Sequence, residues 1–239
     1  MRAVFDPNVE SNPGDPEEVY RGPLPAKAVK VRRAATLILV DRSTGEPRVL
    51  MGRRGAGHVF MPNKWVFPGG RAERGDAFAS SATDISPQVA AALSQHTPRT
   101  SARMARALGM AAIRELREEA GLHLDAPTRH GPALPDLSAL ELVGRAITPP
   151  YRPKRFDALF FAADAVRLLH PERRGGDGEL DEIAWFTLPA AFELDLPNVT
   201  QFILKELEER LTEPGRPPVY LRYLRRRHTV TALPSEPQP

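Results

Sequence analysis

The central part of the chain alternates between apolar runs and polar turn segments. The run Ala34–Asp41 is mostly apolar, which is typical of a strand that is buried on both faces of a sheet. The polar segment Ser43–Pro47 contains glycine and proline and predicts a turn into the next strand. That strand and the later ones are predicted at residues 48–52, 65–67, 140–147, 156–162 and 183–186.

Helical periodicity is strongest just before residue 121. Apolar residues recur there every four positions, at Met104, Leu108, Ala112 and Leu116. This spacing predicts an amphipathic helix, with Ser101 as its N-cap and Gly121 in the left-handed C-cap position. Gly109 is unfavourable inside a helix and marks a point where an inserted segment could rejoin it.

Two shorter helices are predicted on either side of the long one. Pro87–Gln95 follows Ser86, a suitable N-cap, and proline is favoured at the first helical position. The segment Val199–Leu211 is amphipathic and follows Pro197. Strands, the long helix, more strands and a final helix together indicate an α/β protein.

The segment Arg114–Leu122 places a group of acidic residues inside the long predicted helix. Glu115, Glu118 and Glu119 stand at i, i+3 and i+4, so their Cβ atoms would lie roughly 5–6 Å apart on one face. Neighbouring carboxylates repel one another, whereas a hard divalent cation such as Mg²⁺ takes carboxylate oxygens as ligands. Arg114 could orient Glu118 through a charge-assisted hydrogen bond. The alternative is an acidic helix face in contact with solvent.

A glycine pair lies upstream of this helix, in the segment Trp65–Asp76. Gly69 and Gly70 follow an apolar run and a proline, and glycine allows the main chain to approach a ligand closely. Taken together, the two segments resemble the Nudix hydrolase signature, G-x5-E-x7-R-E-U-x-E-E-x-G-U, in which U is a bulky aliphatic residue. Gly70 matches its first position, and Arg114–Leu122 matches its second half throughout.

The resemblance implies the Nudix fold, an α/β/α sandwich with a central mixed sheet. It also implies hydrolysis of a diphosphate bond in a small nucleoside-linked substrate, with Mg²⁺ or Mn²⁺ as the cofactor. Glu115, Glu118 and Glu119 would be metal ligands and, together with Arg114, catalytic residues. Glu115 could instead act as the general base.

Two features depart from the signature. Asp76 stands in place of its first glutamate, and the spacer that follows, residues 77–113, has 37 residues rather than seven. Lengthening a loop costs only about 0.6 kcal/mol per doubling, so such an insertion is physically tolerable. The position of Asp76 relative to the helix is then no longer fixed by spacing. Glu73 is an equally reasonable candidate for the site.

Further candidate residues lie outside the signature. Glu179 and Glu182 belong to an acidic segment before the last predicted strand, and either could supply a general base or belong to a solvated turn. Arginine is suited to bidentate phosphate recognition. The candidates for substrate binding are Arg53, Arg54, Gly69, Gly70 and Arg155. The arginines among them could equally lie on a basic solvated surface.

The interrupted signature also resembles that of animal coenzyme A diphosphatases. The segments Gly57–Pro62 and Arg155–Asp157 are similar to that branch as well. This resemblance implies cleavage of coenzyme A or acyl-coenzyme A to 3′,5′-ADP and a phosphopantetheine. ADP-ribose and nucleoside triphosphates are the alternative substrates. A catalytically inactive domain that senses a nucleotide is the alternative that is not an enzyme.

Composition narrows these possibilities only slightly. The chain of 239 residues is 41% hydrophobic and has no cysteine, which excludes disulfides, zinc–thiolate sites and thiol catalysis. A net charge of +3 is too small to argue for nucleic acid as a partner. No apolar run approaches the ~20 residues needed to cross a bilayer, and residues 1–12 lack the apolar core of a secretory signal. A cytoplasmic protein that does not contact the membrane is expected.

The expected domain organisation is simple. Residues 27–228 are predicted to form one domain, with an insertion at about 77–106. Residues 1–26 contain scattered prolines and predict an irregular arm, and residues 229–239 predict a loose C-terminal tail. The family resemblance suggests a homodimer.

Overall fold

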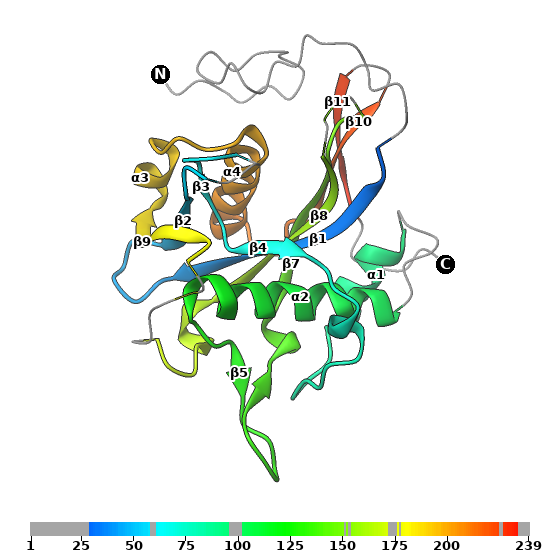
Figure 1. Cartoon of the computed structure of the whole chain (residues 1–239), viewed down its shortest axis with the longest axis vertical. Helices are drawn as coiled ribbons and strands as arrows, with labels where there is room; N and C mark the ends of the chain where they lie inside the picture. The colour runs from blue at the N-terminus through cyan, green and yellow to red at the C-terminus, as the bar shows by residue number, and fades with distance from the viewer. Residues whose placement is uncertain are drawn as a thin grey trace.

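The computed structural model describes residues 29–57, 61–95, 102–150, 152, 154–171, 176, 178–224 and 227–233. The predicted N-terminal arm, the Ser101 cap and the last residues of the predicted tail, 234–239, lie outside these residues. The described residues form a nine-stranded sheet with helices on both of its faces (Figure 1).

The sheet combines parallel and antiparallel strands. Its strands are β1 (Val31–Asp41), β2 (Arg48–Arg54), β3 (Trp65–Val66), β4 (Gly69–Arg71), β7 (Glu141–Ile147), β8 (Arg155–Asp164), β9 (Leu180–Thr187), β10 (Val219–Leu224) and β11 (Arg227–Ala232). Their order is β11-β10-β7-β8-β1-β2-β3, with β4 paired to β1 and β9 paired to β2. The pairs β1–β8 and β7–β10 are parallel, and the other pairs are antiparallel. The predicted central mixed sheet is therefore confirmed.

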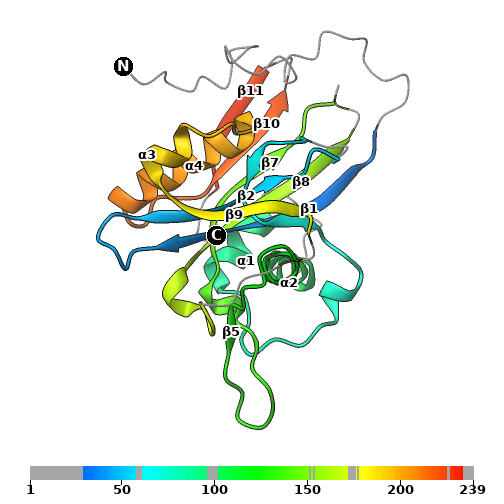
Figure 2. The same ribbon diagram turned by 60° about the vertical axis from the view of Figure 1, so that its left-hand side comes forward.

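Two layers of helices enclose the sheet, as Figure 2 shows from a second direction. They are α1 (Pro87–Gln95) and α2 (Ala102–Ala120) on one face, and α3 (Leu188–Phe192) and α4 (Asn198–Thr212) on the other. Successive residues of β1 point to opposite faces. Leu37 belongs to the apolar cluster of α2, and Ile38 belongs to that of α4. This is why β1 is apolar at consecutive positions, and the three layers confirm the predicted α/β/α sandwich.

Short elements connect these layers. The hairpin of β5 (Asp125–Ala126) and β6 (Leu134–Pro135) projects from the end of α2 (Figure 1). Three short 3-10 helices follow other elements: η1 (Gly75–Ala77), η2 (Leu137–Ala139) and η3 (Ala165–Arg167). The hairpin and these helices were not predicted from the sequence.

The predicted caps at the helix ends are confirmed where the structure describes them. The Oγ of Ser86 accepts a hydrogen bond from the N–H of Val89 at 3.3 Å, which caps α1. Gly121 has a φ of +67°, and its N–H donates to the carbonyl of Arg117 at 3.0 Å, as a left-handed C-cap requires. No helix among the described residues is long and apolar enough to cross a membrane.

The prediction that the insertion rejoins the helix at Gly109 is wrong. α2 runs without interruption from Ala102 to Ala120. A Cβ at position 109 would lie 3.1 Å from a methyl group of Leu137 and from one of Leu140. The glycine therefore serves close packing between α2 and the segment around η2. The inserted segment has already rejoined the helix before this residue.

The predicted loose tail is wrong for its first residues. β11 extends to Ala232, which pairs with Val219 of β10. Leu233 follows it and is only 1% exposed. Residues 229–233 are therefore part of the domain. The sequence did not reveal this strand because polar and charged residues interrupt its apolar pattern.

Candidate active site

α2 packs directly against the glycine pair of β4. β4 pairs with β1, and Gly69 lies opposite Thr36. A Cβ on Gly69 would lie 2.7 Å from the Cα of Thr36, and a Cβ on Gly70 would lie 2.3 Å from Oε1 of Glu115. A side chain at position 69 would collide with the main chain of β1, whereas one at position 70 would displace the carboxylate of Glu115. Gly69 is therefore required for the pairing of β4 with β1, and Gly70 leaves room for the Glu115 carboxylate beside β4.

Glu119 is the most deeply buried carboxylate of α2, with 2% of its surface exposed. Its Oε2 accepts a hydrogen bond from the N–H of Gly69 at 2.8 Å. Burial raises the pKa of Glu119 to about 8, and this hydrogen bond opposes the shift. The charges of Glu115 and Glu179 raise the pKa of Glu119 further, and that of Arg54 lowers it. A cation close to Glu119 would therefore be strongly favoured.

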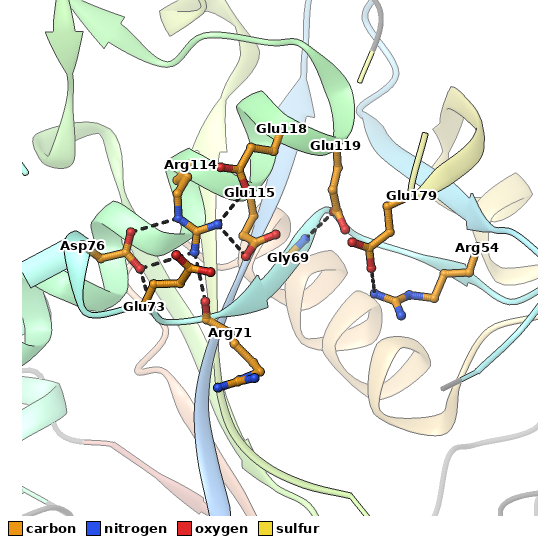
Figure 3. A network of polar contacts seen from close by, with 10 residues as sticks. All are labelled: Arg54, Gly69, Arg71, Glu73, Asp76, Arg114, Glu115, Glu118, Glu119 and Glu179. Atoms are coloured by element: carbon orange, nitrogen blue, oxygen red, sulfur yellow. Dashed lines mark hydrogen bonds and ion pairs between the residues drawn. The ribbon is translucent and has the colours of Figure 1, made fainter. Parts of the chain in front are cut away.

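Glu115 lies one turn earlier on the same face and shares this environment. Burial raises its pKa, although the charge and the hydrogen bond of Arg114 oppose the shift. The charges of Glu118 and Glu179 add to it. Figure 3 shows the carboxylates of Glu115, Glu119 and Glu179 gathered near Gly69.

Arg114 holds the outer carboxylates of α2. Its Nη1 donates to Oε1 of Glu115 at 2.9 Å and to Oε2 of Glu118 at 2.7 Å. Its Nη2 donates to the main-chain oxygen of Arg71 at 2.9 Å, which ties the helix to β4 (Figure 3). These charge-assisted hydrogen bonds fix the directions of Glu115 and Glu118.

Asp76 completes the network around Arg114 from the other side. It is 4% exposed, and its Oδ1 accepts a hydrogen bond from Nε of Arg114 at 3.0 Å. Its Oδ2 accepts one from the main-chain N–H of Glu73 at 2.7 Å. Of the two upstream carboxylates, Asp76 is thus the one whose side chain bonds to Arg114, while Glu73 contributes its main chain to the turn.

Hydrogen bonds hold the first part of the long insertion against the rest of the domain. Nη2 of Arg106, on α2, donates to the carbonyl of Ala79 at 2.7 Å and to Oγ of Ser81 at 2.9 Å. The hydroxyl of Thr83 donates to Asp136 at 2.7 Å. The start of the insertion therefore follows the surface of α2, and Asp76 reaches Arg114 despite the 37-residue spacer.

Arg54 and Glu179 form the opposite rim of the site. Arg54 is the last residue of β2, and its Nη2 donates to Oε1 of Glu179 at 3.1 Å (Figure 3). Glu179 directly precedes β9. A Cβ on Gly176 would lie 1.8 Å from the main-chain oxygen of Glu119, so the main chain at Gly176 lies very close to the end of α2.

Three candidate residues are not brought to this cluster. Met51 packs with the α4 side of the sheet, and Arg53, two residues later in β2, faces the same side. Arg53 pairs there with Glu182 at 3.4 Å, and both side chains are about half exposed. Nε of Arg155 donates to the carbonyl of Thr148 at 3.1 Å. Within the described residues, no contact joins Arg53, Glu182 or Arg155 to the glutamates of α2.

The donor set suits a hard divalent cation in its chemistry. Glu115, Glu118 and Glu119 offer carboxylate oxygens, and the raised pKa values of Glu115 and Glu119 indicate that their charges are incompletely compensated. In the described part of the chain, however, no group of three or more histidine, aspartate or glutamate side chains is arranged to hold a metal ion. Arg114 accounts for this, because it engages both Glu115 and Glu118.

Sequence reasoning did not foresee two contacts of the site. The bond from Gly69 to Glu119 had a local signal, since a glycine pair directly after a strand allows close approach of the main chain. The pair of Arg54 and Glu179 had no local signal in the sequence, because its partners are 125 residues apart in the chain.

Comparison with known proteins agrees with this architecture. A NUDIX hydrolase from Alicyclobacillus acidocaldarius is similar with a TM-score of 0.57 and 26% identity, over 74% of this chain and 90% of that one. A MutT protein from Methanosarcina mazei has 16% identity, with a TM-score of 0.48 over 77% of this chain and 96% of that one. The NUDIX domain of Shewanella oneidensis NrtR, in complex with ADP-ribose, has 14% identity, with a TM-score of 0.46 over 77% of this chain and 90% of that one. No protein-family model and no curated protein matches the sequence. The three layers and the similarity to the Alicyclobacillus structure show that this chain has the fold of the Nudix hydrolases.

Proposed function

We propose that this protein is a Mg²⁺- or Mn²⁺-dependent hydrolase that cleaves a diphosphate bond in a nucleoside-linked compound. The observation that carries the proposal is the position of Glu119, a carboxylate that is 2% exposed, accepts a hydrogen bond from Gly69 and lies beside two further carboxylates. Burial also raises the pKa of Glu119 to about 8. Perturbed groups of this kind are common in sites that bind cations or transfer protons. The Nudix fold places this group beside a glycine pair that allows close approach of a ligand.

The polar residues of α2 have different roles in this proposal. Glu115, Glu118 and Glu119 would hold the cation, after Glu115 and Glu118 give up part of their bonding to Arg114. When bound, the cation would neutralise phosphate oxygens and lower the pKa of the attacking water. Arg114 would keep the two outer glutamates oriented, and Asp76 would keep Arg114 in place.

A carboxylate is also needed to accept the proton of the attacking water. Glu179 is the candidate that we favour, because its charge acts on both Glu115 and Glu119 and its side chain faces the cluster (Figure 3). Glu115 is the alternative base. Glu182 is disfavoured, since it pairs with Arg53 on the α4 side of the sheet.

Coenzyme A or an acyl-coenzyme A is the substrate that we propose, with 3′,5′-ADP and a phosphopantetheine as products. Its support is the resemblance of the interrupted signature, in which 37 residues separate Asp76 from Arg114. ADP-ribose and nucleoside triphosphates are the alternatives. Each of them contains the diphosphate linkage that the acidic site would act on.

A substrate panel tests the proposal directly. Coenzyme A, acetyl-coenzyme A, ADP-ribose, NADH, diadenosine polyphosphates and nucleoside triphosphates would be incubated with the wild-type protein in Mg²⁺ or Mn²⁺. Glu118→Gln and Glu119→Gln are the test variants, and Glu46→Gln, in an exposed turn, is the matched control. Metal-dependent cleavage of one substrate class that both test variants lose and the control keeps is expected. A folded wild-type protein that binds nucleotides but cleaves none would overturn the hydrolase and favour a nucleotide sensor.

A further inference from the structure

The residues that hold Glu179 in place point to a role for Arg54 that differs from phosphate binding. Figure 3 shows the carboxylate of Glu179 beside that of Glu119, at the acidic face of α2. Like charges at such separation repel one another, and Glu179 is 37% exposed in its side chain, so solvent is open to it. Something must therefore keep this carboxylate turned toward the site.

Arg54 supplies the compensating charge. Its guanidinium donates to Oε1 of Glu179 at 3.1 Å, and only 15% of its side chain is exposed. The positive charge of Arg54 therefore offsets part of the repulsion that Glu179 meets at the acidic face of α2.

The main chain around Arg54 is built to hold the guanidinium at this place. The N–H of Arg54 donates to the carbonyl of Lys64, and its own carbonyl accepts from the N–H of Asn63, both at 3.0 Å. The pairing of β2 with β9 shifts register between Arg53 and Arg54. Such an irregularity redirects side chains at the end of a strand pair.

The partner strand is held just as closely. Arg54 lies opposite Leu180, the residue that follows Glu179. A Cβ on Gly52 would lie 2.3 Å from Cδ1 of Leu180, so the glycine is required for Leu180 to pack onto β2. Main-chain hydrogen bonds therefore fix the position of Arg54, and the packing of Leu180 fixes the position of the neighbouring Glu179. The ion pair is thus part of the junction between β2 and β9 and is not an isolated surface pair.

We propose that Arg54 is a positioning residue that holds the Glu179 carboxylate at the acidic face of α2. This inference rests on the proposed hydrolase function, in which Glu179 accepts a proton. Arg54 acts through Glu179, and it does not need to touch the substrate.

Steady-state kinetics with a double-mutant cycle test the inference. Arg54→Gln should lower kcat by about 10- to 100-fold with little change in KM, because a misplaced general base costs rate rather than affinity. Arg54→Lys keeps the charge and should recover part of the loss. The double variant Arg54→Gln, Glu179→Gln should be no slower than Glu179→Gln alone. Arg53→Gln, which removes the neighbouring half-exposed pair, should change kcat far less.

Two kinetic results would overturn the inference. A rise in KM of tenfold or more with kcat retained would make Arg54 a substrate ligand. Losses that multiply in the double variant would show that Arg54 and Glu179 act independently.

A crystal structure of the Arg54→Gln protein tests the same inference without a measurement of activity. The Glu179 carboxylate is expected to turn away from Glu119, and an unchanged position would overturn the inference. This readout separates the two proposals. If the wild-type protein hydrolyses no substrate, the proposed function fails, and the position of Glu179 in the variant still decides the role of Arg54.

Discussion

Asp136 and Glu119 are two almost fully buried carboxylates, and their surroundings differ sharply. Asp136 is 3% exposed and accepts hydrogen bonds from the hydroxyl of Thr83 and from both the N–H and the hydroxyl of Ser138. Arg167 forms an ion pair with it. Burial alone would raise the pKa of Asp136, but these donors outweigh burial and hold that pKa below its usual range.

Glu119 exposes just as little of its surface, but it lies deeper in the protein and accepts far fewer hydrogen bonds. Within the described residues, the hydrogen bond that its carboxylate accepts comes from Gly69. Its pKa rises to about 8, mainly through burial, and the charges of Glu115 and Glu179 contribute to the rise. Asp136 is therefore stable as an anion, whereas Glu119 needs either a proton or a cation.

The difference separates a structural carboxylate from the one for which we propose a catalytic role. Asp136 connects Thr83 in the insertion with Arg167 beyond β8, so its satisfied charge joins distant segments of the domain. The unsatisfied charge of Glu119 costs stability and becomes favourable once a ligand neutralises it. The exposed fraction of the side chain does not distinguish the two roles, but the depth of burial and the number of donors do.

The largest effect is expected from Glu119→Gln on catalysis. The amide removes the charge that would bind the cation, so kcat/KM in Mg²⁺ should fall by about 100- to 1,000-fold. The melting temperature of the metal-free protein should stay the same or rise, because a poorly compensated buried charge is lost. Retained activity together with a clear loss of stability would make Glu119 a structural residue and remove the contrast with Asp136.

Asp136→Ala should show the reverse pattern. The substitution leaves the hydroxyls of Thr83 and Ser138 without the acceptor they share and removes the ion pair with Arg167, which costs about 2–4 kcal/mol in the free energy of unfolding. Urea unfolding measures this loss. Arg167→Gln should cost less, since that side chain is 49% exposed. A fall in kcat of more than about threefold, measured well below the melting temperature, would contradict a purely structural role.

The acidic group of α2, including Glu119, could be predicted from the sequence because its pattern is local. Glu115, Glu118 and Glu119 follow helical spacing, and the same 3.6-residue period predicts the apolar stripe that buries α2. The strands β1, β2, β7 and β8 were also predicted, since each is a compact apolar run. Local patterns of this kind depend only on neighbours along the chain.

The structural carboxylate could not be predicted, because its partners are remote. Thr83 and Arg167 lie 53 and 31 residues from Asp136 in the chain. The junction of Arg54 with Glu179 spans 125 residues, and its geometry depends on an irregular strand pairing that leaves no local trace. The prediction that the insertion rejoins the helix at Gly109 failed for a related reason. The small size of this residue matters only through packing against Leu137, which is distant in the chain.

The two carboxylates should also respond to pH in opposite directions. The pKa of Glu119 is raised from an ordinary value of 4.5 to about 8, so the folded protein retains a proton that the unfolded chain releases. The stability of metal-free wild type relative to Glu119→Gln should therefore fall as pH rises from about 4.5 to about 8. The pKa of Asp136 is lowered from 3.8. Its contribution is present above that value and is lost as pH falls through the lowered pKa.

Urea unfolding of the metal-free proteins at a series of pH values measures both responses. The stability difference between wild type and Glu119→Gln should change across neutral pH, and that between wild type and Asp136→Asn should change only in acid. Differences that stay constant with pH for both variants would show that neither group has a perturbed pKa.

The smallest effect is expected from Arg106→Gln. This variant tests whether the attachment of the insertion to α2 affects the rate of catalysis. Arg106 bonds the start of the insertion to α2, and its loss should cost about 1 kcal/mol in unfolding free energy. Asp84→Asn is the matched control, because Asp84 pairs with Arg106 at 3.5 Å while its side chain is 83% exposed. If Arg106→Gln leaves kcat nearly unchanged, the hydrogen bonds between Asp76 and Arg114 do not depend on the rest of the insertion. A tenfold fall in kcat would mean that the insertion acts through Asp76 on the glutamates that we propose as catalytic. Asp136 and Glu119 would then belong to one coupled network, and the contrast between them would fail.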